Sequence, residues 1–336
     1  MKIDNNFYMN LALNEAWKYQ GLTYPNPAVG CTIVGQNGEI LSVEAHQKAG
    51  APHAEVNALK SAFYKLTKND DILQLSNSLD IHKFLEKNHN DLFVDVSVFT
   101  TLEPCSHVGK TPSCANLLAK LGVKKVYVGS IDSNTEASDG NKILINSSID
   151  VDTSILKDEC DDLLRPFELW QKKNFVFFKW AQRLNGTTDN GIITSKETRK
   201  FTHAMRDVCD LLVIGGNTVR EDRPTLDARD VGGKAPDILI YSKSKDFDKT
   251  IPLFNIDGRK VIISDSFNEL ENYKNIMIEG TSNMYELTRD IVDYYLCYVA
   301  PKLGGVNKFE NNEDKFNILN LQKGLQDIIM WIKRQP

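Results

Sequence analysis

One histidine, one glutamate and two cysteines in the first third of the chain have the types and spacing of a catalytic metal centre. His53 and Glu55 lie two residues apart, and Cys105 and Cys114 follow later. Catalytic zinc takes three protein ligands, commonly imidazole and thiolate, and keeps a fourth position for water. Bound water then has a pKa of about 7, so hydroxide is present at neutral pH. We therefore expect His53, Cys105 and Cys114 to bind one Zn²⁺ and Glu55 to move protons beside it.

This set of residues is typical of enzymes that hydrolyse an amino group from a nucleobase-like ring. Zinc deaminases of this kind share H-x-E followed by P-C-x-x-C, in which the glutamate is an acid/base and not a ligand. Here Pro104 precedes Cys105, but the eight residues 106–113 separate the two thiols. The longer gap counts against the cytidine and tRNA-adenosine types and favours a subfamily with a longer loop.

A structural zinc site, or a pair of inert buried thiols, is the alternative interpretation. A structural site needs a fourth strong ligand, and His107 is the nearest candidate because it lies between the two cysteines. A carboxylate two residues after the histidine has no use in such a site. Glu55, together with Pro104, therefore favours the catalytic interpretation.

The ligands are expected at the beginnings of two helices. Pro52 suits a helix start just ahead of His53, and the first turn of that helix can direct His53 and Glu55 into one pocket. The β-branched run at 97–102 predicts a strand, and a helix is expected from Cys114. A helix N-terminus favours the thiolate form of cysteine. Three further elements are expected around these segments: a helix over 5–19, a hairpin of strands 31–35 and 39–44 around an Asn-Gly turn, and a strand over 125–130.

Length and composition limit the other possibilities. A chain of 336 residues predicts two domains. The net charge of −5 gives no general attraction to nucleic acid. No apolar run approaches the roughly 20 residues of a membrane span. Six cysteines are too few and too unevenly spaced for a disulfide framework, so a cytoplasmic enzyme is expected.

We expect a zinc-dependent deaminase domain over 1–150, with an inserted helical segment at about 61–92, a connector over 151–174, and a second α/β domain over 175–336. Strands are predicted at 175–181, 210–215, 237–241, 260–263, 275–279 and 294–299. Their alternation with helical stretches predicts a mostly parallel sheet. Two of these strands, at 210–215 and 275–279, run into glycine turns that could bind a phosphate group.

The chain resembles the bifunctional riboflavin-biosynthesis deaminase–reductases. The specific motifs are PNPAVGC at 25–31, HQKAGAPHAEVNAL at 46–59 and TLEPCSHVGKTPSC at 101–114, whose eight-residue gap between cysteines that family shares. The resemblance covers nearly the whole chain, apart from the 61–92 insertion and the C-terminal tail. It implies an α/β fold, with an N-terminal cytidine-deaminase-like α/β/α sandwich followed by a dihydrofolate-reductase-like α/β domain that uses NADPH.

The resemblance implies two reactions in riboflavin biosynthesis. The first is hydrolytic deamination of 2,5-diamino-6-(5-phosphoribosylamino)pyrimidin-4-one. The second is NADPH-dependent reduction of the ribosyl group, which gives 5-amino-6-(5-phosphoribitylamino)uracil. The expected partner is therefore a small phosphoribosyl pyrimidine, with no nucleic acid and no membrane, and a homo-oligomer (a dimer or tetramer) is expected.

Site residues carry over from the family's motifs onto this sequence. His53, Cys105 and Cys114 would bind zinc, and Glu55 would be catalytic. The expected substrate contacts are Asn26, Arg206, Leu226, Arg229 and Glu279. The expected NADPH contacts are Ala181, Thr218, Asp222, Gly280, Thr281 and Ser282.

The second half departs from the family pattern. The usual K-x-A-x-S-L-D-G-K is KWAQRLNGT at 179–187, with Arg183, Asn185 and Thr187 at the changed positions, and Glu-Gly-Gly ends in Thr281. Because NADPH itself supplies the hydride, we expect the second domain to retain reductase activity despite these changes. Two alternatives stay open: a deaminase whose C-terminal half is a non-catalytic binding or dimerisation module, and a nucleic-acid base editor, which the acidic balance disfavours.

Overall fold

Two α/β units, Met1–Glu168 and Leu169–Pro336, follow one another along the chain. The structure is a computed structural model that describes residues 3–106, 111–132, 139–189, 191–310, 313–324 and 326–335. No helix in these ranges has the length and apolar character needed to cross a bilayer.

The first unit is built on a five-stranded sheet in the order β2-β1-β3-β4-β5. Its strands are β1 (Gly30–Val34), β2 (Ile40–Ala45), β3 (Ser97–Leu102), β4 (Lys125–Ser130) and β5 (Asp150–Thr153). Strand β1 is antiparallel to β2 and β3, whereas β3, β4 and β5 are parallel. The hairpin predicted from the Asn-Gly turn is confirmed, and Gly38 adopts the positive φ of 83° that the turn requires.

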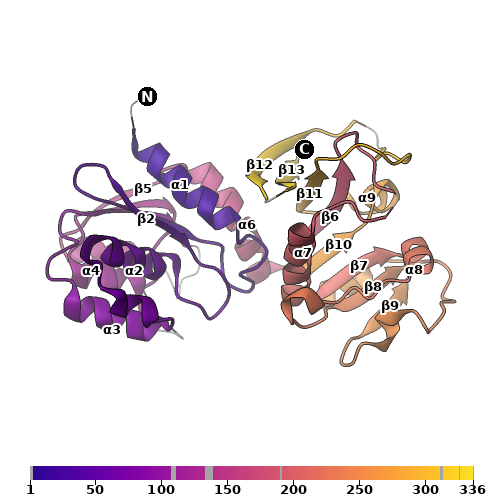
Figure 1. The fold of residues 1–336 in the computed structure, drawn as a ribbon, viewed down its shortest axis with the longest axis horizontal. Helices are drawn as coiled ribbons and strands as arrows, with labels where there is room; N and C mark the ends of the chain where they lie inside the picture. Colours follow the sequence, from indigo (N-terminus) through magenta and orange to yellow (C-terminus); the bar gives the residue numbers. More distant parts are fainter. Residues whose placement is uncertain are drawn as a thin grey trace. The chain divides into compact units, whose positions relative to one another are not determined.

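Helices cover both faces of this sheet and confirm the expected three layers (Figure 1). One face carries α1 (Asn5–Trp17) and α6 (Lys157–Lys172). The other carries α2 (Ala54–Thr67), α3 (Ser78–Asn88) and α4 (Cys114–Leu121), and α5 (Gly140–Asn146) packs beside α4.

The expected insertion is helical and contributes to the core. Helix α2 continues to Thr67, and the short helix η1 (Asp70–Gln74) and α3 follow. Asn77 caps α3 by accepting hydrogen bonds from Leu79 N and Asp80 N. Ile72, Ile81 and Leu85 are fully buried in the core of the first unit. Because many polar residues lie between these three apolar positions, the sequence gives only a weak signal that the segment is buried.

Most of the stretch 151–174, expected as a connector, is folded into the first unit. Strand β5 pairs with β4, and Leu164 on α6 joins the core. The Gln20 amide donates to the Leu163 carbonyl oxygen at 2.6 Å. The charged side chains of α6 are mostly exposed, a pattern that is also typical of a solvated linker.

The second unit contains an eight-stranded sheet in the order β12-β13-β11-β6-β10-β7-β8-β9 (Figure 1). Its strands are β6 (Phe175–Arg183), β7 (Leu211–Gly215), β8 (Asp237–Tyr241), β9 (Val261–Ser264), β10 (Asn275–Glu279), β11 (Tyr294–Ala300), β12 (Phe316–Lys323) and β13 (Ile328–Arg334). Strands β6 to β11 are mutually parallel, as expected. The antiparallel pair β12–β13, not foreseen from the sequence, extends the sheet beyond β11.

Parallel pairing gathers the carboxyl ends of β6, β7, β8 and β10 at one edge of the sheet. Ligand sites in open α/β sheets form at this edge. The helices that begin or pass there are α7 (Lys196–Val208), α8 (Gly216–Asp222) and α9 (Ser282–Thr288). The short helices η2 (Arg229–Val231), η3 (Pro252–Asn255) and η4 (Asn268–Asn272) lie in the connections.

Gly30 allows α1 to lie directly on β1, and its replacement should weaken the first unit. A Cβ atom at Gly30 would lie 1.9 Å from the Ala12 main-chain oxygen. We expect Gly30→Ala to lower the free energy of unfolding by about 1–3 kcal/mol, the usual cost of overpacking, measured by urea denaturation. The control is Gly35→Ala, whose Cβ would have the flexible Glu39 carboxylate as its nearest contact. Equal stability of the two variants would contradict this account of the packing.

Candidate active sites

The three expected zinc ligands converge in the structure. His53 Nδ1 lies 3.6 Å from Cys105 Sγ and 3.4 Å from Cys114 Sγ, and the three ligand atoms lie within 4.8 Å of one another. Tetrahedral zinc, with bonds of about 2.1 Å to nitrogen and 2.3 Å to sulfur, separates these atoms by about 3.6 Å. Within the described ranges, this is the one group of three or more such side chains close enough to hold a metal ion. The donor set and its spacing therefore fit zinc.

Two helix starts hold these ligands. His53 is the N-cap residue of α2, and Cys114 is the first residue of α4, which Ser113 caps by accepting from Asn116 N. Ser113 Oγ also donates to the Cys105 carbonyl oxygen at 2.8 Å and so joins the two cysteine segments. A hydrogen bond from the Cys114 thiol lowers the pKa of Cys105 well below its usual range and so favours the thiolate there.

The far nitrogen of the histidine ligand also has a partner. Thr111 Oγ1 lies 3.3 Å from His53 Nε2. Such a contact to the second ring nitrogen orients a metal-binding imidazole. His107, the candidate for a fourth ligand, lies outside the described residues.

Glu55 lies beside the ligands and is almost completely buried. It occupies the first turn of α2, two residues after His53, so that both side chains border one cavity. Burial raises the pKa of Glu55 to about 7, and the nearby Cys105 contributes to the rise. A carboxyl group in this state can both accept and release a proton near neutral pH.

The cavity above these residues has a volume of about 350 Å³, and Asn26 lies in its wall. His46 Nδ1 lies 3.1 Å from the Pro52 carbonyl oxygen, which can only accept, and this assigns the proton to Nδ1. His46 Nε2 then accepts from the Asn26 amide at 3.1 Å. Burial lowers the pKa of His46 to about 4, so the ring is neutral and holds Asn26 in place. His46 was part of a motif in the sequence, but no role was expected for it.

A second polar centre lies at the carboxyl edge of the second sheet. Arg206 on α7 donates from Nε to Glu279 Oε1 at 2.9 Å, and Lys179 Nζ lies 3.6 Å from Glu279 Oε2. Burial alone would raise the pKa of Glu279, but the charges of Arg206 and Lys179 outweigh it and hold the pKa at about 2. Two of the expected substrate contacts, Arg206 and Glu279, therefore meet directly. Lys179, which the sequence marks only as a preserved residue of the KWAQRLNGT motif, is the third member of this cluster.

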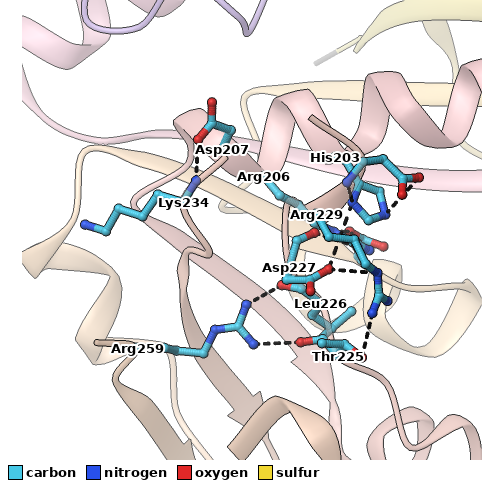
Figure 2. A network of polar contacts seen from close by, with 11 residues as sticks. His203, Arg206, Asp207, Thr225, Leu226, Asp227, Arg229, Lys234 and Arg259 are labelled. Atoms are coloured by element: carbon cyan, nitrogen blue, oxygen red, sulfur yellow. Dashed lines mark hydrogen bonds and ion pairs between the residues drawn. The ribbon is translucent and has the colours of Figure 1, made fainter. Parts of the chain in front are cut away.

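The other two substrate contacts expected in this unit lie next to Arg206 (Figure 2): Leu226 in the connection after α8, and Arg229 at the start of η2. Arg206 Nη1 donates to the Asp227 carbonyl oxygen at 3.5 Å. The Asp227 carboxylate pairs with Arg229 Nε at 3.3 Å. Leu226 is buried, whereas the Arg229 side chain is largely exposed and can reach a ligand.

A second cavity, of about 380 Å³, lies where β7, β8 and β10 end. Of the expected NADPH contacts, Thr218, Gly280 and Thr281 line it. Gly215 and Gly216, in the glycine turn predicted to bind a phosphate group, also line it, together with Arg220. Ser242, Lys243 and Ser244 line it as well and were not expected. Glycine turns, hydroxyl groups and two cations together suit the phosphate groups of a dinucleotide. No short motif marks 242–244 in the sequence, because this loop reaches the cavity only through the pairing of β8 with β7.

Three of the expected NADPH contacts do not line this cavity. Ala181 lies near the carboxyl end of β6, and Asp222 is the last residue of α8. Ser282 begins α9, and its hydroxyl oxygen accepts a hydrogen bond from Glu310 N.

The residues that depart from the family pattern join two loops. Arg183 is buried and donates from Nη1 to the Asp189 carbonyl oxygen at 2.7 Å. Asn185 donates to the Gly304 carbonyl oxygen at 2.9 Å, and the Thr187 hydroxyl donates to the same oxygen. These contacts hold the turn after β6 against the loop that follows β11.

Comparison with known families matches both halves of the chain. Residues 2–130 match the model of the cytidine and deoxycytidylate deaminase zinc-binding region, and residues 175–323 match the RibD C-terminal domain. The two-domain α/β class expected from the sequence, with a cytidine-deaminase-like first domain, is thereby confirmed.

Similar proteins extend over nearly the whole chain. The riboflavin biosynthesis protein RibD of Aquifex aeolicus is 31% identical over 90% of this chain and 88% of its own length. The RibD of Actinobacillus pleuropneumoniae is 29% identical over 89% and 84%. A diaminohydroxyphosphoribosylaminopyrimidine deaminase/5-amino-6-(5-phosphoribosylamino)uracil reductase from Thermotoga maritima has a crystal structure with a TM-score of 0.64, 25% identity and 98% coverage of both chains. The chain belongs to the RibD family of riboflavin-biosynthesis enzymes, and it joins a zinc-binding deaminase domain to a reductase domain.

Proposed function

We propose that the first domain hydrolyses the 2-amino group of 2,5-diamino-6-(5-phosphoribosylamino)pyrimidin-4-one, and that the second reduces the ribosyl group of the product with NADPH. The product would be 5-amino-6-(5-phosphoribitylamino)uracil. The observation that carries the proposal is the convergence of His53, Cys105 and Cys114 beside buried Glu55. The similarity to the Thermotoga maritima enzyme supports the choice of substrate. A homo-oligomer remains a prediction from the resemblance.

In the deaminase, His53, Cys105 and Cys114 would hold one zinc ion. The ion, when bound, supplies the acidity that makes water a nucleophile near neutral pH. Water adds to the ring carbon that carries the amino group, and the carbon–nitrogen bond breaks to release ammonia. Glu55 takes a proton from water and delivers it to the departing nitrogen, a transfer that its raised pKa favours. Asn26, held by His46, would orient the ring.

In the reductase, NADPH would lie at the glycine turns, with Thr218, Gly280 and Thr281 among its contacts. The cofactor supplies the hydride. Arg229 and Arg206 provide cationic groups for the substrate phosphate, and Leu226 supplies an apolar contact. The Glu279 carboxylate, charged because of Arg206 and Lys179, can accept hydrogen bonds from ribose hydroxyl groups. Ala181, Asp222 and Ser282 stay proposed cofactor contacts from the resemblance.

Replacing Glu55 with glutamine should separate metal binding from catalysis. The amide cannot carry a proton, so we expect ammonia release to fall at least about a hundredfold while bound zinc stays near one per chain. Zinc is measured by atomic emission on the same protein. Ammonia release at the wild-type rate would contradict the role of Glu55.

Removing one thiolate should remove zinc and deamination but leave the reductase intact. We expect Cys105→Ala to lose most bound metal and all measurable ammonia release, because three ligands hold a catalytic zinc. NADPH oxidation with the deaminated substrate should remain within about twofold of wild type. The matched control is Cys160→Ala, which removes a buried thiol of the same unit. Zinc content that is equal in the two variants would exclude Cys105 as a ligand.

Neutralising Glu279 should impair reduction over the whole neutral pH range. Glu279→Gln leaves Arg206 and Lys179 without their buried counter-charge, so we expect kcat/KM for reduction to fall about tenfold or more. Because the pKa of Glu279 is about 2, the carboxylate stays ionised between about pH 5 and pH 8, and the wild-type-to-variant ratio should be constant there. Exposed Glu271→Gln is the control. A ratio that declines steeply from pH 8 to pH 5 would mean that Glu279 titrates in this range.

NADPH oxidation tests the competing function, a deaminase whose C-terminal half only binds or dimerises. The wild-type chain, given the deaminated substrate, should oxidise one NADPH per molecule reduced. Folded protein that shows no such turnover would favour the alternative.

A further inference from the structure

The segment 224–229, which follows α8 and ends at the first residue of η2, contains a residue in an unfavourable backbone conformation that contacts from other segments must stabilise. Leu226 has a φ of 56°, a left-handed conformation that is unfavourable for a residue with a bulky side chain. Its side chain is buried. Non-glycine residues persist in this region of φ where the surrounding structure holds them.

Arg259 provides that support from the segment just before β9. Its Nη1 donates to the Thr225 carbonyl oxygen at 2.7 Å, and its Nη2 donates to the Leu226 carbonyl oxygen. Its Nε donates to the Pro236 carbonyl oxygen at 2.9 Å, which fixes the guanidinium against the start of β8. Figure 2 shows Arg259 extended toward the loop, with its guanidinium facing Thr225 and Leu226.

The guanidinium is directed to main-chain carbonyl groups and not to an acidic side chain. Among the ion pairs of the described residues, none involves Arg259. Burial lowers the pKa of Arg259 to about 10, so it remains charged at neutral pH. A planar fork of donors can reach several carbonyl oxygens at once, whereas a lysine ammonium group lacks that geometry.

The other side of the loop meets the proposed substrate contacts. Asp227 follows Leu226, and its carbonyl oxygen accepts from Arg206 Nη1 while its carboxylate pairs with Arg229. Arg206 in turn contacts Glu279. One short stretch of backbone therefore connects Arg259 to the groups that would bind the phosphorylated substrate.

We propose that Arg259 is a positioning residue of the reductase: by holding the Thr225 and Leu226 carbonyl groups, it sets where Leu226 and Arg229 meet the substrate. Arg259 touches neither substrate nor cofactor in this account. The inference rests on the proposed function of the second domain.

The test compares Arg259→Lys and Arg259→Met with the full-length wild type. Both variants should raise KM for the deaminated, phosphorylated substrate about tenfold, while kcat stays within about threefold and KM for NADPH within about twofold. Hydrogen–deuterium exchange should become faster at the amides of 225–229. Ammonia release by the first domain of the same protein serves as the internal control for folding.

The matched control is Lys249→Met, which removes an exposed cation of the same domain that lies over the Phe254 ring and leaves the Arg259 contacts in place. Lys249→Met should behave as wild type in every measurement. Unchanged KM and unchanged exchange in Arg259→Lys would overturn the proposal, because charge alone would then suffice. A fall in kcat with KM unchanged would overturn it as well. If the wild type fails to oxidise NADPH, the proposed function fails, and the exchange at 225–229 still decides the role of Arg259.

Discussion

The deaminase site depends on the meeting of two helix N-termini. His53 begins α2 and Cys114 begins α4, while Cys105 comes from the turn that follows β3. Three ligand atoms from segments far apart in the sequence lie within 4.8 Å only because both helices pack on the same face of one sheet. The close approach that Gly30 allows on the opposite face lets α1 cover the sheet there. The packing of this domain is therefore a condition for its chemistry.

The proposed reductase site depends on a different constraint, the parallel alignment of β6, β7, β8 and β10. Parallel pairing places Lys179 opposite Glu279 in the register and brings the glycine turns after β7 and β10 to one edge. Burying a carboxylate is costly unless cations compensate it. Arg206 and Lys179 meet that requirement, and they keep Glu279 charged where a polar ligand would bind. The strands are therefore apolar along their buried length, and charged side chains lie where they end.

The sequence predicted the features that follow from local patterns. Short signatures of residue type or period mark the converging group of His53, Cys105 and Cys114, the adjacent Glu55, the Asn-Gly hairpin and the six parallel strands. Other features arise only from tertiary contacts. Ser242, Lys243 and Ser244 line the second cavity because β8 pairs with β7. Arg259 contacts Thr225, which lies more than 30 residues earlier in the sequence. Strands β12 and β13 were not predicted, and the buried side chains of α6 are interspersed with many charged residues, a composition that is also typical of an exposed connector.

We propose that one chain carries two active sites that act in sequence on one pyrimidine. Incubation of the zinc-depleted chain with NADPH, and with either the diamino substrate or its deaminated product, tests this most directly. We expect NADPH to be consumed only with the deaminated product, and restored zinc to allow its consumption with both compounds. Equal NADPH oxidation with both compounds in the absence of zinc would contradict it, because reduction would then not depend on prior deamination.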